Sequence, residues 1–189
     1  MTKTKIRAPG SSKCAQARER LRRRYRPANV RLLFVGEAPP ASGRFFYKSD
    51  SGLYRAVRDT FTHVFPTIGE NEFLTSFQAL GCYLVDLCGK PVDRLPRPQR
   101  TKACREGEVR LARILKRLRP EIVVTVVRSI AGNVGRSQRL ANWSGIHIEL
   151  PYPGRWFHHR AAFVRGLALA LRRAFGRRLA DLNPLANIP

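Results

Sequence analysis

Apolar positions along the chain form short, strand-length runs that alternate with stretches of helical spacing. Strands are predicted at 31–35, 82–88, 122–127 and 146–150. Residues 122–127 are apolar apart from one threonine, which is typical of a strand buried on both faces. Apolar residues at helical spacing predict helices at 51–64, 109–118 and 161–175, the second closed by Pro120. A further helix is predicted at 14–24, with its arginines in solvent.

The alternation of strands and helices indicates an α/β fold. We expect a three-layer α/β/α domain around a central four-stranded, mainly parallel sheet. In open sheets of this kind, ligands bind beyond the carboxyl ends of the strands. Three of the predicted strand ends lead into segments with unusual residues, which are 36–46, 86–100 (a predicted loop from 89 onward) and 151–160. We therefore predict that these three segments converge on one site.

The composition adds a strong positive charge to this picture. The chain has 189 residues, with 36 Lys plus Arg against 13 Asp plus Glu, which gives a formal charge of +23. Six arginines lie between residues 18 and 26 around the single acid Glu19. We divide the chain into a basic N-terminal leader, 1–28, and one α/β domain, 29–189.

This charge favours a polyanionic partner, of which nucleic acid is the most abundant. No apolar run approaches the roughly 20 residues that a membrane-spanning helix needs, so no membrane partner is expected. The first residues lack the apolar stretch of a signal peptide. We expect a cytoplasmic monomer. A basic protein for RNA or an anionic membrane surface is an alternative that rests on charge alone.

The loop after the first predicted strand leads to a resemblance. The residues that carry it are Leu32-Leu33-Phe34-Val35-Gly36-Glu37-Ala38-Pro39, the aromatic Phe46, Gly52-Leu53-Tyr54, Arg94-Leu95-Pro96, Cys104 and Leu118-Arg119-Pro120-Glu121-Ile122-Val123-Val124. In this order they resemble the uracil-DNA glycosylase superfamily, in its GEAPG-type, family 4-like branch, over residues 32–160. The resemblance implies a monofunctional DNA repair enzyme that flips a damaged base out of DNA and hydrolyses its N-glycosidic bond, leaving an abasic site.

The resemblance also implies roles for the first loop. Glu37, its only acid, would position the attacking water or stabilise the positive charge that develops on the sugar. Ala38 would contact the base, and Phe46 would stack on it, with Phe45 or Tyr47 as alternatives in a shifted register. Two plainer interpretations stay open: Glu37 caps a turn or pairs with an arginine, and Phe46 is an ordinary core residue.

Two further motif positions depart from the family pattern. Asp86 stands where the family has an asparagine that reads the edge of uracil. A carboxylate only accepts hydrogen bonds, so Asp86 is either protonated, suited to another base, or placed to hold a water. Tyr152-Pro153-Gly154 stands where the family typically has His-Pro-Ser, so the missing histidine is replaced by Tyr152, His158 or His159.

Contacts with DNA are expected from basic and aromatic residues near these motifs. Arg155 and Trp156 are suited to a phosphate contact and to a wedge between bases. The full set of predicted DNA-binding residues is Arg44, Arg94, Arg155, Trp156 and Arg160.

No metal or other cofactor is expected for the reaction. The four cysteines are most simply small core residues, and they include no CxxC pair. The GEAPG-type branch usually holds an iron–sulfur cluster on four cysteines that begin with such a pair. A cluster here would use Cys14, Cys82, Cys88 and Cys104.

The departures at residues 86 and 152 leave two functions open. One is excision of uracil or a related deaminated base. The other is a catalytically weakened protein of the same fold that binds DNA or abasic sites without excision.

Overall fold

The computed structural model describes residues 10–154 and 156–182. Its centre is a parallel sheet of four strands in the order β2-β1-β3-β4, which confirms the predicted α/β fold. The strands are β1 (Leu32–Gly36), β2 (Cys82–Asp86), β3 (Ile122–Thr125) and β4 (Ile146–Glu149). Strands β1, β2 and β3 are buried along their whole length, whereas β4 is half-exposed at one edge.

The register of the sheet sets which residues meet at its carboxyl edge. Gly36 at the end of β1 pairs with Asp86 at the end of β2, and Val35 pairs with Thr125 of β3. The hydrogen bonds continue one step beyond the strands, because Leu87 donates to the Gly36 carbonyl and Cys88 donates to the Glu37 carbonyl. The two loops that follow β1 and β2 therefore leave the sheet side by side.

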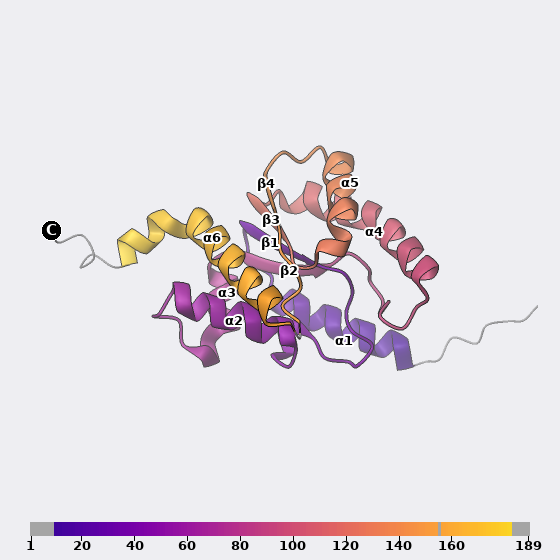
Figure 1. The fold of residues 1–189 in the computed structure, drawn as a ribbon, viewed down its shortest axis with the longest axis horizontal. Helices are drawn as coiled ribbons and strands as arrows, with labels where there is room; N and C mark the ends of the chain where they lie inside the picture. The colour runs from indigo at the N-terminus through magenta and orange to yellow at the C-terminus, as the bar shows by residue number, and fades with distance from the viewer. Residues whose placement is uncertain (1–9, 155, 183–189) are drawn as a thin grey trace, which may run out of the picture.

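Helices cover both faces of the sheet, as predicted (Figure 1). On one side lie α2 (Gly52–Val64), α3 (Phe73–Ala79) and α6 (Phe157–Leu182), and on the other lie α4 (Arg97–Leu118) and α5 (Ala131–Ala141). α1 (Gly10–Arg24) packs beside the short 3-10 helix η1 (Phe46–Lys48). No helix in the described part of the chain is long and apolar enough to cross a membrane.

The structure corrects three expectations about helices. α4 begins at Arg97, so the predicted loop over 89–100 is shorter than expected. α3 and α5 were not predicted. α1 was predicted to carry its arginines in solvent, yet the Arg22 side chain is only 11% exposed, because it forms an ion pair with Asp86.

Candidate active site

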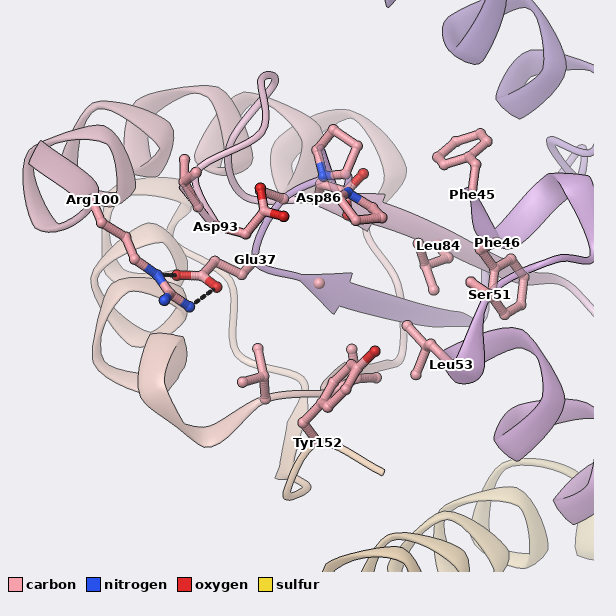
Figure 2. A pocket seen from close by; sticks show the side chains of 17 residues that line it. Glu37, Phe45, Phe46, Ser51, Leu53, Leu84, Asp86, Asp93, Arg100 and Tyr152 are labelled. Carbon is pink, nitrogen blue, oxygen red and sulfur yellow. Dashed lines mark hydrogen bonds and ion pairs between the residues drawn. The ribbon is translucent and has the colours of Figure 1, made fainter. Parts of the chain in front are cut away.

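A cavity of about 380 Å³ opens at the carboxyl edge of the sheet. This volume lies in the range of small-ligand sites. Each segment predicted to converge there contributes to the lining, with Glu37 and Phe46 from the first, Asp86 from the second and Tyr152 from the third. Figure 2 shows Glu37 and Arg100 at one end of the cavity, Phe45 and Phe46 at the other, and Asp86 and Tyr152 on its two sides.

Glu37 follows β1 directly and is held by an arginine from α4. Arg100 Nε donates to Glu37 Oε1 at 2.5 Å, and its Nη2 donates to Oε2. The Glu37 side chain is only 15% exposed. This hydrogen-bonded carboxylate raises the pKa of Arg100, so the guanidinium stays charged. The pairing with an arginine, considered from the sequence, is present, and it fixes the Glu37 carboxylate at the cavity wall.

Asp86 ends β2 and lies against Gly36. A Cβ atom on residue 36 would come within 2.9 Å of Asp86 Oδ1, so a glycine at 36 is what admits this carboxyl. Arg22 Nη2 donates to Oδ2 at 2.7 Å, and Arg110 donates to the Asp86 backbone carbonyl. Burial raises the pKa of the Asp86 carboxyl, and the positive charge of Arg22 acts against this rise.

Phe45 and Phe46 form an aromatic wall of the cavity. Phe46 also belongs to the core, because its ring packs edge-on against Tyr47, Tyr54 and Phe73. The Phe46 ring therefore lines the cavity, as stacking on a base requires, and it is also a core residue.

Tyr47 is placed away from the cavity lining. Its hydroxyl donates to the Leu84 carbonyl at 3.1 Å and accepts from the Leu84 amide at 2.7 Å. This hydroxyl satisfies backbone groups of the edge strand β2, so Tyr47 is not brought to the place where a base would stack.

Tyr152 closes the cavity from the loop after β4. Its side chain is partly exposed and lines the cavity together with Val126 and Val127, which follow β3. Burial raises the pKa of its phenol, and Arg55 opposes that rise. The hydroxyl therefore keeps its proton, and it can donate a hydrogen bond, throughout the neutral range.

Residues 23–171 match the Uracil DNA glycosylase superfamily. The chain belongs to this superfamily. The matched region contains the cavity loops after β1, β2 and β4, and it begins one residue after Arg22. No curated protein matches the chain.

Superfamily membership leaves open which residue replaces the motif histidine, and the geometry separates the three candidates. Tyr152 lines the cavity. His158 and His159, at the start of α6, are exposed and do not appear in its lining. Their rings lie 4.3 Å apart, and His158 stacks on Trp156 at 6.4 Å. The structure therefore brings Tyr152 to this site of the glycosylase fold and leaves both histidines outside it.

The residues predicted to contact DNA lie in different settings. Arg44 and Arg94 are exposed, on loops whose neighbours line the cavity. Trp156 is also exposed, and Arg160 forms an ion pair with Asp59 at 3.0 Å. Arg155 lies outside the described residues.

A second, basic groove adjoins the cavity of this glycosylase fold. It shares Glu37 and Arg100 with the cavity and runs between the start of α4 and α5. Its further polar and basic lining residues are Arg97, Thr101, Arg105, Ser129, Asn133 and Arg136. Arginines and hydroxyl groups of this kind suit a phosphate backbone.

The four cysteines do not fit an iron–sulfur cluster. Cys88 and Cys104 lie close together, with their sulfurs 3.7 Å apart. Cys82 begins β2, whereas Cys88 lies two residues beyond its end, so the length of the strand, roughly 13 Å, lies between them. Cys14 is exposed on α1. Within the residues described, no three His, Cys, Asp or Glu side chains are grouped to hold a metal ion.

Two residues of the site were missed from the sequence. Arg100 had a local signal, because Pro96 and Pro98 mark the first turn of α4. A helix beginning there puts Arg100 one turn before Cys104, on the side that faces Glu37. The sequence contains no local signal for Arg22, because its partner Asp86 is 64 residues away.

Proposed function

We propose that this protein is a monofunctional DNA glycosylase that hydrolyses the N-glycosidic bond of uracil or a related deaminated base and leaves an abasic site. The observation that carries the proposal is the cavity itself. It places an arginine-held carboxylate, Glu37, opposite an aromatic wall at the carboxyl edge of a superfamily fold. A flipped base needs such a stacking surface, and the sugar needs such a carboxylate.

The reaction puts positive charge on the sugar and negative charge on the departing base. Glu37 acts on the sugar side, where its carboxylate stabilises that positive charge or orients the attacking water. Arg100 keeps the carboxylate in a single orientation by its two hydrogen bonds. On the base side, the Tyr152 hydroxyl supplies a proton donor for the oxygen on which negative charge develops.

DNA is the substrate in this proposal, and the basic groove beside the cavity supports a path for its backbone. The groove ends at Glu37, so a strand lying along it delivers one nucleotide to the cavity mouth. Arg97 and Arg105 are exposed along this path, where they meet phosphates and position the strand.

Excision by wild-type protein and by Glu37→Gln tests the proposal. We expect wild type to produce alkali-labile strand breaks in an oligonucleotide that contains uracil, hypoxanthine or xanthine. Glu37→Gln keeps the side-chain shape but removes the negative charge, so we expect a rate at least a hundredfold lower with nearly unchanged DNA affinity. The matched control is Glu72→Gln, because Glu72 is an exposed acid of the short 3-10 helix before α3. Equal rates for wild type and Glu37→Gln would remove Glu37 from the mechanism.

Two observations favour a second function, binding of DNA or abasic sites without excision. Both Glu37 oxygens are engaged by Arg100, and no histidine is found among the described residues that line the cavity. This function predicts no strand break with any of the three bases, together with tighter binding to an abasic-site duplex than to an intact one. The same oligonucleotides therefore decide between the two functions.

A further inference from the structure

Helix α1 contributes a buried arginine to the back of the base cavity. Arg22 contacts two residues of the cavity lining, because its Nη2 donates to Asp86 Oδ2 at 2.7 Å and its guanidinium lies 5.3 Å from the centre of the Phe45 ring. Its other terminal nitrogen, Nη1, donates to Glu19 at 2.7 Å. The superfamily match begins at residue 23, so Arg22 is a feature of this chain outside the matched region.

The pair is buried, so its geometry is constrained. The exposed fractions of the side chains are 11% for Arg22 and 8% for Asp86. Separating such a pair leaves an uncompensated buried charge, which is strongly unfavourable. Asp86 therefore keeps Oδ2 turned toward Arg22, and Oδ1 lies over Gly36 at the cavity wall. Among the side-chain hydrogen bonds of the described residues, the one that the Asp86 carboxyl accepts goes to Oδ2.

A fixed acceptor at this wall distinguishes bases by their hydrogen-bond donors. Deamination of cytosine or adenine converts a ring nitrogen that accepts a hydrogen bond into a ring N–H that donates one. N3 of cytosine becomes N3–H of uracil, and N1 of adenine becomes N1–H of hypoxanthine. A carboxylate oxygen accepts from such an N–H and repels an acceptor nitrogen.

We propose that Arg22 is a positioning residue that holds Oδ2 of Asp86 and so presents Oδ1 to the ring N–H shared by deaminated bases. This inference rests on the proposed function. It assigns the selection of the base to an ion pair between α1 and β2, and it makes α1 part of the substrate site.

The inference predicts an unusual result for Asp86→Asn. With Arg22 in place, the amide must turn its oxygen toward the guanidinium, because two donors cannot face each other. Its NH2 group then faces the base, where it repels the ring N–H and suits an acceptor nitrogen. An asparagine at 86 should therefore weaken binding to uracil relative to cytosine, although an asparagine reads uracil in the related enzymes.

The measurement is the ratio of Kd values for two single-stranded oligonucleotides that carry 2′-fluoro-deoxyuridine or 2′-fluoro-deoxycytidine, neither of which is cleaved. We expect wild type to favour uracil and Asp86→Asn to lower that preference at least tenfold. In the Asp86→Asn background, Arg22→Met frees the amide to rotate. We therefore expect the double variant to recover at least half of the lost preference for uracil, measured as the logarithm of the ratio of the two Kd values. Neither partner of the Arg22–Asp86 ion pair is charged in the double variant, so neither is left as an unpaired charge.

Arg23→Met in the Asp86→Asn background is the matched control. Arg23 lies on the same helix and also pairs with Glu19, but its side chain is 75% exposed and it does not contact Asp86. We expect no recovery from this substitution, although it removes the same charge from α1.

Two results would overturn the inference. One is an unchanged or increased preference for uracil in Asp86→Asn. The other is the same preference in Asp86→Asn with and without Arg22→Met, which would leave Arg22 a purely structural residue. Failure of the proposed function looks different, because it appears as absence of excision by wild type. The response of the ratio to Arg22→Met still reports on positioning in that case, whereas a wild-type preference for cytosine would contradict the inference as well.

Discussion

Tyr152 provides a proton donor that differs in chemistry from the histidine typical of its motif. A histidine loses its proton near pH 6.5, whereas an unperturbed tyrosine keeps its proton to about pH 10. Burial raises the pKa of Tyr152 above that value. The neutral phenol is therefore the only form present at neutral pH, and it can donate to a departing base without first taking up a proton.

This difference predicts the effect of Tyr152→Phe and its dependence on pH. Removing the hydroxyl should slow single-turnover excision by about tenfold, the loss of one neutral hydrogen bond of roughly 1.4 kcal/mol. Because the pKa is raised, the donor is fully protonated below about pH 9 and is lost only as the pH rises through the folded-state pKa. The ratio of wild-type to Tyr152→Phe rates, measured from pH 6 to pH 9, should stay constant. A ratio that falls to one within this range would show that Tyr152 is not the donor.

At the scale of elements, the parts of the fold that follow from local sequence were predicted and the others were not. The runs at 31–35 and 122–127 are strongly apolar, so their burial in the sheet follows from their composition. α5 has few apolar residues, among them Val134, and is held mainly by its packing against α4. α3 has only seven residues. Neither helix has a hydrophobic period long enough to identify it from one sequence.

The same division applies to the site. The segments that contain Glu37, Asp86 and Tyr152 were predicted because each begins at the end of a strand, and the carboxyl edge of a parallel sheet collects such segments. The three residues themselves were singled out by the resemblance to the glycosylase superfamily. Arg22 and Arg100 act through partners 64 and 63 residues away. The prolines at 96 and 98 indicate locally that Arg100 lies in the first turns of a helix. Local patterns contain no information about contacts of that range, so the pairing of the two arginines with the two carboxyl groups appears only in the structure.

Two helical glycines have opposite surroundings, so replacing each by alanine should have opposite effects on stability. One is packed where α4 contacts the loop after β2, and the other has open space around it. A Cβ on Gly107 of α4 would overlap the Leu87 backbone carbonyl, and a backbone atom cannot move aside easily. We expect Gly107→Ala to lower the free energy of unfolding by about 1–3 kcal/mol. Gly135 of α5 has open space around it, with its nearest neighbour at 3.9 Å, so Gly135→Ala should raise that free energy by about 0.5–1 kcal/mol. Urea unfolding of the two variants measures both changes in the free energy of unfolding. Equal urea midpoints for Gly107→Ala and Gly135→Ala would contradict the packing described for α4.

At the scale of the whole molecule, the net positive charge is large, but some of the arginines are engaged in ion pairs and others are free to contact a ligand. Of the arginines at the site, Arg22, Arg100 and Arg136 are engaged by Asp86, Glu37 and Glu108. The arginines beside the cavity and groove that form no ion pair in the described part of the chain include Arg44, Arg94, Arg97 and Arg105. Arg44 and Arg94 adjoin residues that line the cavity, and Arg97 and Arg105 line the groove. We therefore expect these four to release counterions when DNA binds.

DNA affinity should therefore fall steeply with salt, by an amount set by these four residues. Each phosphate contact contributes about −0.7 to −0.9 to the slope of log K against log salt, so four contacts predict about a hundredfold loss between 50 and 200 mM. Replacing Arg44 and Arg94 together by alanine should make the slope shallower by about 1.5.

The matched control replaces Arg172 and Arg173, which are exposed on α6, by alanine. They directly precede Ala174, whose carbonyl accepts from Arg31 at the amino edge of the sheet, so they lie at the opposite end from the cavity. Equal slopes for the two double variants would mean that DNA binds by overall charge and does not use the cavity face.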